Sequence, residues 1–345
     1  MLRICLIFLI TSAFLNAQDK EILGSGKWTF EFLPKGILLP EEHAKKVQDY
    51  HGVAVDSQGR VYVGYYTKKA DQDTRSVARF NYNPGQNPPF KFDRFLGDTS
   101  WVKARLHGLN VIKTKSGEER VLLVYNTHMV ILCDLDGNID KEMTFKAQHK
   151  QFRKASDGHY SPLSAQLGIY DGYATNVLHE MDFNGSLTNK KHGSKGKGLD
   201  KTNTAHGVGL DPAGNYVIAD RGNKRLVWRK PDFKPLLSKK DPSKHVQLAT
   251  PGLEVCNVQF KDDYAVLPCL NSRIAFLKKS SDSESGYELD SYFAMPKNLI
   301  KQGYDGIHDV NFSIDGKYLI VAVWQRNRKI PPRLFALKKV SEKSK

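Results

Sequence analysis

Four of the eleven histidines in the sequence open near-copies of one short phrase. The phrase is a histidine, a small or acidic residue and then alternating apolar positions, and it begins at His51, His107, His206 and His308. Neutral imidazole is a preferred ligand of zinc, and several imidazoles aimed at one point would hold such an ion with a position left open for substrate. The alternative is that the histidine is a consensus feature of the repeat that only hydrogen-bonds its neighbours. The fold decides between the two, because it determines where the four copies lie.

The copy that begins at His206 shows which elements carry the phrase. Residues 206–210 alternate as a half-buried strand does, and a tight turn, Asp211-Pro-Ala-Gly, follows them. Residues 215–220 and 225–230 predict two further strands, separated by a second turn. Each unit is therefore expected to be a small antiparallel sheet with the histidine at the start of its first strand.

The spacing of the histidines indicates how many units there are. The steps are 56, 99 and 102 residues, so each longer step contains one copy without histidine at a repeat length of about 50, which is typical of propeller blades. One such copy is a hairpin between residues 253 and 277, with Cys256 in place of histidine. The other lies between residues 160 and 181 and has an abbreviated first strand. Six units predict an all-β fold, a six-bladed β-propeller with four antiparallel strands per blade around a central channel.

A ring of blades has to close, and the two ends of the repeat region offer a way. Residues 28–32 (Trp-Thr-Phe-Glu-Phe) alternate and precede the first repeat, so we expect this strand to pair beside residues 333–338 and complete the last blade. The longer insertions are expected to build a loop-rich face that binds a small-molecule or peptide substrate. These insertions are residues 67–75, 81–101, 147–164, 190–204 and 280–304.

The N-terminus has the pattern of a signal peptide, residues 1–17. Arg3 precedes an apolar stretch, residues 4–15, and the small residue Ala17 follows it. This stretch is too short to span a membrane, so we expect no membrane span. The signal-peptide pattern predicts that the protein is secreted or periplasmic. The mature chain, residues 18–345, is expected to be a single propeller domain.

The formal net charge of +15 raises the question of an anionic partner. Lysine and arginine are scattered, and they form neither a basic helix face nor a pattern interleaved with aromatic residues. The pattern therefore argues against nucleic-acid binding and indicates a basic, well-solvated exterior. The oligomeric state is left open.

Three cysteines follow the predicted signal peptide, namely Cys133, Cys256 and Cys269. Cys256 and Cys269 are equidistant from the centre of the predicted hairpin, so they face each other across two antiparallel strands. In an oxidising compartment they would be close enough to form a disulfide. The alternative is two buried thiols that pack as small apolar residues.

The repeated phrase is similar to NHL-type repeats, and more narrowly the chain resembles peptidyl-α-hydroxyglycine α-amidating lyase, the zinc lyase of peptide-amidating enzymes. The family's three zinc histidines are matched by His107-Gly-Leu, His206-Gly-Val and His308-Asp-Val, without the proline that the family has before each. The resemblance implies that these three histidines hold Zn²⁺.

Three further positions match the family. Arg221 in Ala-Asp-Arg corresponds to an arginine that binds the substrate carboxylate, and Tyr173 in Asp-Gly-Tyr corresponds to the proposed catalytic tyrosine. Asp309 corresponds to an aspartate that helps to hold a structural calcium ion, Ca²⁺. The resemblance therefore implies catalytic roles for Tyr173 and Arg221 and a metal-binding role for Asp309.

The sequence also departs from the family. The place of the family's second arginine, in the first blade, is held by Tyr66, and Gly306 replaces a methionine before the third histidine. His51 is an additional histidine. It is interpreted as a fourth metal ligand, as a hydrogen-bonding partner of a ligand, or as a consensus residue of the repeat.

The resemblance implies a zinc-dependent carbon–nitrogen lyase that converts a carboxylate-bearing α-hydroxy amide into an amide and glyoxylate, or acts on a related small carboxylate. The alternative is a non-catalytic NHL-repeat scaffold that binds a peptide, glycan or protein, because function does not follow from fold. A lactonase with calcium at the channel mouth is less compatible with the sequence, since such sites use carboxylates and asparagine where this chain has imidazoles.

Overall fold

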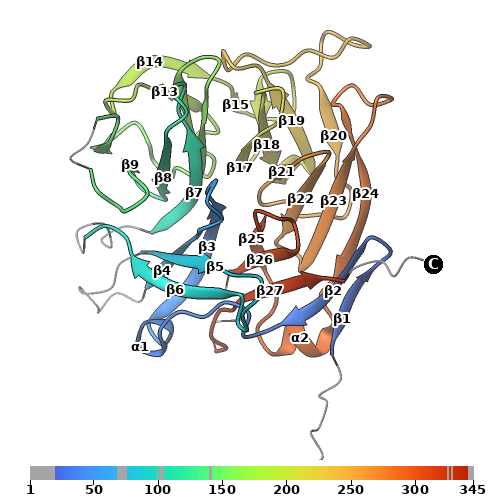
Figure 1. Ribbon diagram of the computed structural model, residues 1–345. Coiled ribbons are helices and arrows are strands. Elements are labelled where there is room, and N and C mark those ends of the chain that lie inside the picture. Colours follow the sequence, from blue (N-terminus) through green and yellow to red (C-terminus); the bar gives the residue numbers. More distant parts are fainter. Residues whose placement is uncertain are drawn as a thin grey trace, which may run out of the picture.

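The structure is a computed structural model of the 345-residue chain, and it describes residues 20–67, 76–98, 101, 105–139, 142–324, 326–327 and 329–340. Within these ranges the chain forms six antiparallel sheets, five of four strands and one with a fifth strand at its edge (Figure 1). The predicted signal peptide lies outside the described residues. No helix in the described ranges is long and apolar enough to cross a membrane.

The first three blades follow one another along the chain, each running from its inner strand to its outer strand. Their strands are β3 (Val47–Val55), β4 (Val61–Thr67), β5 (Val77–Tyr82) and β6 (Phe90–Phe95) in blade 1; β7 (Leu106–Lys113), β8 (Glu119–Tyr125), β9 (Met129–Cys133) and β10 (Phe145–Gln148) in blade 2; and β11 (Asp157–Ser161), β12 (Gln166–Tyr170), β13 (Leu178–Met181) and β14 (Leu187–His192) in blade 3.

The last three blades repeat this order, except that the N-terminal strands complete blade 6. Their strands are β17 (Ala205–Leu210), β18 (Tyr216–Asp220), β19 (Arg225–Arg229) and β20 (Gln247–Ala249) in blade 4; β21 (Gln259–Lys261), β22 (Tyr264–Cys269), β23 (Arg273–Lys279) and β24 (Tyr287–Ala294) in blade 5; and β25 (Ile307–Phe312), β26 (Tyr318–Val323), β27 (Leu334–Lys339), β2 (Trp28–Leu33) and β1 (Ile22–Ser25) in blade 6. Between blades lie β15 (Ser194–Lys195), β16 (Lys201–Thr202) and two short helices, α1 (Glu41–Ala44) and α2 (Lys297–Lys301).

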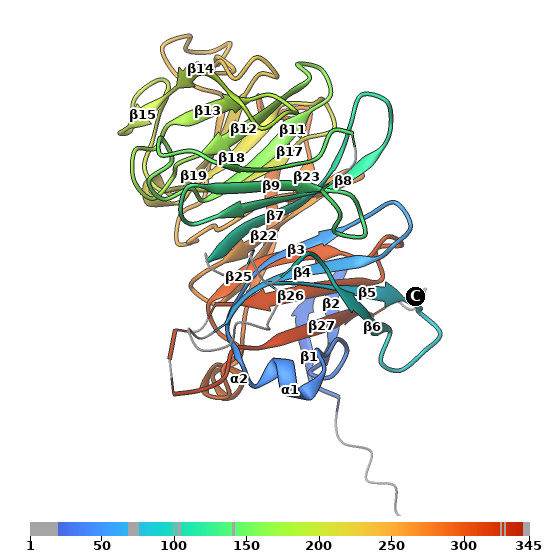
Figure 2. The ribbon, with the colours of Figure 1, turned by 90° about the vertical axis from the view of Figure 1, so that its left-hand side faces the viewer.

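The six inner strands surround one axis. Each contacts the inner strand of the next blade, in the order β3, β7, β11, β17, β21, β25 and back to β3. Figure 1 looks along this axis, and Figure 2 shows the same blades from the side. The predicted all-β, six-bladed propeller of four-stranded blades is therefore confirmed.

An aspartate and a glycine make the tight turns of the repeat. In blade 4 the backbone N–H of Gly214 donates to the carbonyl oxygen of Asp211 at 2.8 Å, and the Asp211 carboxylate accepts from the N–H of Asn215 at 2.8 Å. Gly214 has φ +81°, which favours glycine. The same arrangement at Asp56 and Gly59 in blade 1 explains why the phrase can be recognised in the sequence.

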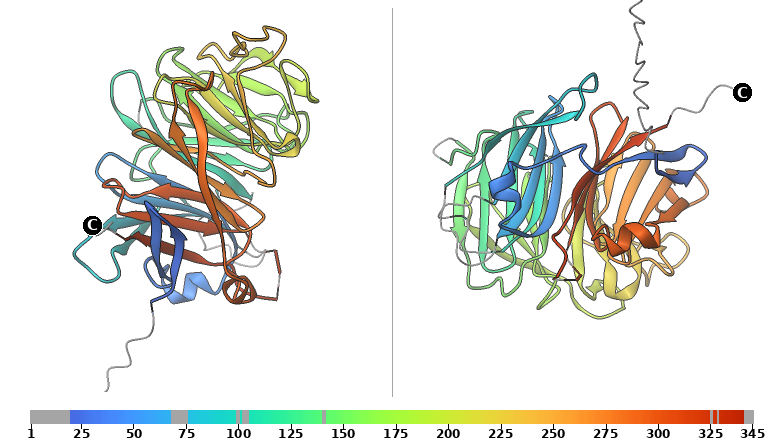
Figure 3. Two further views of the ribbon diagram at one scale, coloured as in Figure 1. Left: turned by 90° about the vertical axis from the view of Figure 1, so that its right-hand side faces the viewer. Right: turned by 90° about the horizontal axis from the view of Figure 1, so that it is seen from below.

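The ring closes as the sequence predicted. Strand β2 pairs with β27 in antiparallel register, with Phe30 opposite Lys339 and Phe32 opposite Leu337. Figure 3 shows these strands, from the two ends of the chain, side by side. Trp28 anchors β2 by stacking on Phe276 of blade 5 at a centroid distance of 3.9 Å. Closure removes the open sheet edge that a linear row of blades would expose.

The structure shows which residues stand at the histidine position in the two blades that lack histidine. The abbreviated first strand of blade 3 is β11, which begins at Asp157, so residue Ser156 stands where the other blades have histidine. In blade 5 that place belongs to Cys256, as predicted. Cys133, Cys256 and Cys269 are free and buried, so the interpretation as buried thiols, rather than a disulfide, is the one that the structure supports.

Candidate metal centre

Three of the four repeat histidines converge on the channel. His107, His206 and His308 are each the second residue of an inner strand, in blades 2, 4 and 6 respectively. One ligand atom from each lies within 4.8 Å of the others, and the ring centroids are 4.8 to 4.9 Å apart. All three side chains are buried. We call His107, His206 and His308 the histidine triad.

Hydrogen bonds to the backbone orient all three rings in the same way. The Nδ1 of each ring faces a backbone carbonyl oxygen. The distance is 2.7 Å from His107 to the oxygen of Ser156, 2.8 Å from His206 to the oxygen of Cys256, and 2.7 Å from His308 to the oxygen of His51. A carbonyl oxygen can only accept, so each Nδ1 carries the proton and each Nε2 keeps its lone pair. This is the arrangement by which proteins orient a metal-binding imidazole.

The donor set therefore fits a metal such as zinc. The Nε2 of His206 is buried and has no hydrogen-bond partner among the described residues, as expected for an atom whose partner is an ion. Three imidazoles would leave a fourth tetrahedral position for water or substrate. In the described part of the chain, the group that could hold a metal consists of the triad alone.

Burial keeps the triad neutral. It lowers the pKa of His107 and of His206 well below the usual range, and it lowers that of His308 to about 3. The charge of Arg221 lowers each pKa further. A metal would therefore meet little competition from protons at these nitrogens near neutral pH.

His51 occupies the corresponding place in blade 1. Its ring centroid is 4.5 Å from that of His308 and 5.1 Å from that of His107. It lies outside the triad, but its backbone carbonyl orients His308. The structure thus places His51 beside the candidate site and makes it a hydrogen-bonding partner of a triad member through its backbone.

Two buried aspartates directly follow the repeat position that histidine holds in most blades, Asp309 after His308 and Asp157 after Ser156. Asp309 accepts hydrogen bonds from the N–H groups of Val53 and Val310, at 2.8 and 2.9 Å, and from the Asn257 side chain at 3.1 Å. Burial raises its pKa well above the usual range. Both carboxylate oxygens thus face N–H donors, and a calcium role for Asp309 stays a prediction.

Asp157 has the equivalent place in blade 3. Its carboxylate accepts from the N–H of Val208 in blade 4 at 2.9 Å and from the side chain of Asn110 in blade 2 at 3.0 Å. Burial raises its pKa to about 7. This aspartate therefore ties three successive blades together around the channel.

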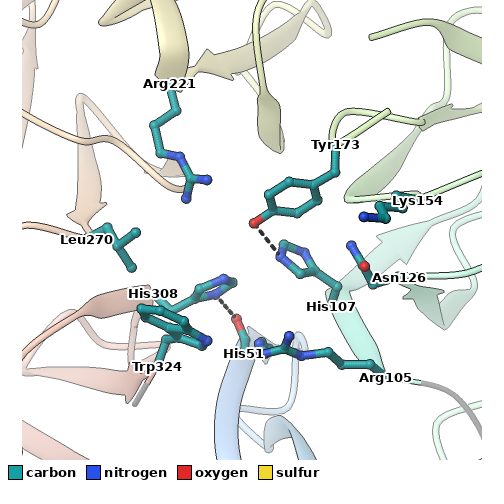
Figure 4. A pocket seen from close by; sticks show the side chains of 10 residues that line it. All are labelled: His51, Arg105, His107, Asn126, Lys154, Tyr173, Arg221, Leu270, His308 and Trp324. Atoms are coloured by element: carbon teal, nitrogen blue, oxygen red, sulfur yellow. Dashed lines mark hydrogen bonds between the residues drawn. The ribbon is translucent and has the colours of Figure 1, made fainter. Parts of the chain in front are cut away.

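Tyr173 is held against the triad by the motif Asp-Gly-Tyr. The carboxylate of Asp171 accepts from the backbone N–H of Lys154 at 2.6 Å and so fixes the turn. A side chain at Gly172 would collide with the carbonyl oxygen of Ala205, so only glycine fits. The Tyr173 hydroxyl then lies 3.1 Å from the Nε2 of His107 (Figure 4). Although 37% of the residue is exposed, desolvation of its hydroxyl group raises the pKa of Tyr173, and Arg221 opposes this rise.

Arg221 follows the second strand of blade 4 in a short 3₁₀ turn, residues Arg221–Asn223. Arg221 directly follows Asp220, so an ion pair between neighbours is the alternative to a role in the cavity. The Asp220 carboxylate instead binds Arg225, with Nε to oxygen 2.7 Å, which leaves Arg221 free to face the cavity. The Arg221 guanidinium lies 5.7 Å from the ring centroid of Tyr173 and 3.7 Å from the sulfur of Cys256.

A cavity of about 350 Å³ borders two members of the triad, His107 and His308, whereas His206 is not among the residues that line it (Figure 4). Its lining includes residues that the sequence predicted, namely His51, His107, Tyr173, Arg221 and His308. It also includes residues that sequence reasoning missed, namely Arg105, Asn126, Lys154, Leu270 and Trp324. Each of these five lies just before or just after a strand of the repeat, and a search of the positions flanking each histidine would have found Arg105.

Arg105 bears on one departure from the family. Tyr66 stands where the family has its second arginine, but the guanidinium of Arg105 lies 5.7 Å from the centroid of the Tyr66 ring. A second arginine is therefore present at this side of the cavity, on a different blade.

Comparisons with known proteins show the fold. No protein-family model and no curated protein matches the sequence. A solved streptogramin B lyase structure superposes with a TM-score of 0.54 and 10% sequence identity, covering 91% of this chain and 99% of that chain. A chain of a mitotic checkpoint complex superposes with a TM-score of 0.51 and 11% identity, covering 99% of both chains. At these identities the likeness shows a shared propeller architecture and nothing finer.

Proposed function

We propose that this protein is a metal-dependent lyase that cleaves the carbon–nitrogen bond of a carboxylate-bearing α-hydroxy amide. The observation that carries the proposal is the buried histidine triad, two members of which line one cavity with Tyr173 and Arg221, the Tyr173 hydroxyl lying 3.1 Å from the Nε2 of His107. We further propose that the metal is zinc and that residues 1–17 export the protein as a signal peptide. The resemblance of these residues, and of the NHL-type phrase, to peptidyl-α-hydroxyglycine α-amidating lyase supports the same reaction.

The triad would hold the metal through its three Nε2 atoms. A metal bound there supplies Lewis-acid chemistry, which makes the hydroxyl group of the substrate more acidic. Arg221 would bind the substrate carboxylate as a two-pronged donor and so place the hydroxyl-bearing carbon over the triad. Leu270 and Trp324 give the cavity an apolar wall.

Tyr173 would move the proton. Its oxygen, as phenolate, takes the proton of the substrate hydroxyl, and the carbon–oxygen bond becomes a carbonyl as the carbon–nitrogen bond breaks. The electron pair of that bond goes to the nitrogen, which takes up a proton, so the products are an amide and glyoxylate. Desolvation raises the pKa of Tyr173, and Arg221 counteracts part of this rise, so the phenolate that this step requires depends on Arg221.

The fold is compatible with lyase chemistry, because the structural neighbour described above is itself a lyase. The non-catalytic scaffold is the alternative proposal. It differs from the lyase in needing neither a metal nor the Tyr173 hydroxyl, so the two can be separated by experiment.

The decisive experiment measures metal content and glyoxylate release together. Purified protein is analysed for bound metals beside a His107→Ala/His206→Ala double variant, and both are incubated with an α-hydroxyglycine-terminated peptide. We expect about one zinc per chain and glyoxylate formation in the parent, and neither in the double variant. A parent protein that binds no transition metal and forms no glyoxylate would support the scaffold instead.

A further inference from the structure

Arg105 is a cation whose hydrogen-bonding capacity is only partly used. It lies immediately before β7, and one terminal nitrogen donates to the buried carboxylate of Asp49 at 2.7 Å. Its Nε is buried and has no hydrogen-bond partner among the described residues. Since Arg105 lines the cavity and its side chain is 35% exposed, an anion that entered there could accept from the guanidinium nitrogen that does not bind Asp49.

Arg105 and Arg221 stand on opposite sides of the channel. Arg221 extends from blade 4 and contacts Cys256 of blade 5, whereas Arg105 extends from blade 2 and contacts Asp49 of blade 1. In a ring of six blades, the 4–5 junction is opposite the 1–2 junction. Figure 4 shows the two guanidinium groups on either side of Tyr173 and His107. The triad therefore lies between two cationic groups.

The lining of the cavity is positively charged on balance. Arg105, Lys154 and Arg221 all contribute to it, and no acidic side chain is among the described residues that line it. Asp49 offsets one of these charges from outside the lining. A single carboxylate bound to Arg221 would leave the opposite side of the cavity uncompensated, and such a site favours a ligand with a second negative group.

We infer that Arg105, assisted by Lys154, forms a second anion-binding subsite, and that the substrate carries two anionic groups, one on each side of the reacting carbon. This inference rests on the proposed function for the reaction itself. The cavity volume of about 350 Å³ lies at the small end of the range for small-molecule sites, so the substrate is compact. An α-hydroxy amide whose acyl part ends in a second carboxylate has this chemistry.

Equilibrium binding tests the subsite without requiring turnover. Linear dicarboxylates from malonate to adipate are titrated into the zinc-loaded protein by calorimetry, each beside the monocarboxylate of the same chain length. We expect at least one dicarboxylate to bind about tenfold or more tightly than its monocarboxylate partner, which is the effect of one additional charged hydrogen-bonded contact. Equal affinities throughout the series would overturn the inference.

Variants locate the effect. R105M should reduce the dicarboxylate preference to about onefold while leaving monocarboxylate binding at Arg221 intact, and K154M should reduce it in part. R105K keeps a charge beside Asp49, and so protects the fold, but removes the second terminal nitrogen of the guanidinium and should lose several-fold in dicarboxylate affinity. The matched control is R94M, because Arg94 is an exposed arginine that pairs with Asp136 on the outer strand β6. Unchanged dicarboxylate affinity in both R105M and R105K would overturn the inference.

A substrate pair separates this inference from the proposed function. N-Succinyl-α-hydroxyglycine has two carboxylates. Its isostere N-succinamoyl-α-hydroxyglycine keeps the carboxylate of hydroxyglycine and has a neutral amide in place of the second. Glyoxylate formed equally from both, with R105M unaffected, would contradict the subsite but uphold the lyase. A dicarboxylate preference that depends on Arg105, without glyoxylate from either compound, would uphold the subsite and contradict the lyase.

Discussion

The even blades and the odd blades use the same repeat position for different purposes. In blades 2, 4 and 6 this position is a histidine whose side chain faces the channel, and in blades 1, 3 and 5 it is His51, Ser156 or Cys256. The odd positions contribute through their backbone carbonyl oxygens, each of which orients one histidine of the triad. A sixfold repeat thus carries a threefold cluster, in which one half of the ring supplies the imidazole side chains and the other half supplies the carbonyl oxygens that orient them.

The largest expected effect comes from removing a histidine side chain in an even blade, compared with removing one in an odd blade. His206→Ala removes an even-blade ligand, so we expect the loss of stoichiometric zinc and a fall of activity to background. His51→Ala removes an odd-blade side chain but keeps the carbonyl that orients His308, so zinc should remain and activity should fall by about tenfold at most. Metal analysis of the two purified variants checks this, and loss of zinc in His51→Ala would show that His51 is a fourth ligand.

Tyr173 sharpens the comparison, because it is a side chain from an odd blade that we expect to take part in the chemistry. Tyr173→Phe removes only the hydroxyl, so kcat should fall by about 10²- to 10⁴-fold while zinc content and KM change little. The measurement is steady-state glyoxylate release beside metal analysis. Unchanged kcat would mean that Tyr173 only packs against the triad.

The pH dependence of stability distinguishes the buried aspartates from the buried histidines. Asp157 has a folded-state pKa of about 7 against an ordinary value of 3.8, so between these values the unfolded chain binds fewer protons and stability falls as pH rises. The triad has lowered pKa values and acts in the opposite direction below about pH 6.5.

The variant Asp157→Asn isolates the first contribution. Between pH 4 and 7, the free energy of unfolding of the metal-free variant should fall less with pH than that of the parent, by on the order of 1 kcal/mol or more, since each pKa unit corresponds to about 1.4 kcal/mol. Chemical denaturation at several pH values measures this difference. Parallel curves for the two proteins would mean that Asp157 ionises normally in the folded state.

The smallest effect is expected where only the backbone acts. Cys256→Ser keeps the carbonyl that orients His206, so zinc content should be unchanged and KM should shift by about threefold at most, through the lost contact with Arg221. The same metal and kinetic measurements apply. A loss of zinc comparable to that of His206→Ala would remove the distinction between the two halves of the ring.

Much of this site follows from the sequence because repeats carry positional information. A histidine in repeat phase must lie near the axis, which is why the triad and its blades could be predicted. Tyr173 and Arg221 needed the family resemblance, since both lie in turns to which the repeat pattern assigns no role. The fold explains them afterwards, through the close approach at Gly172 and through the pairing of Asp220 with Arg225.

Other features could not be predicted, because they depend on which blades become neighbours in space. Nothing in the residues around Ser156 indicates that its carbonyl oxygen faces His107, which lies 49 residues earlier in the chain. The position of Arg105 could not be predicted for the same reason, since its guanidinium lies beside the Tyr66 ring of the preceding blade. The separation of the triad from His51 likewise depends on the directions of the rings, which the repeat leaves undetermined.

The seam between blades 6 and 1 has a consequence for the order of biosynthesis. The contacts that cross it near the channel include those from His308 to the carbonyl of His51 and from Asp309 to the N–H of Val53, and β2 pairs with β27 within blade 6. The histidine triad therefore cannot be complete on a nascent chain, because His308 is translated near the end and is oriented only after the first blade has met the sixth. If the triad binds a metal, as we propose, metal binding would mark a completed ring, and binding to the closed form alone would stabilise closure.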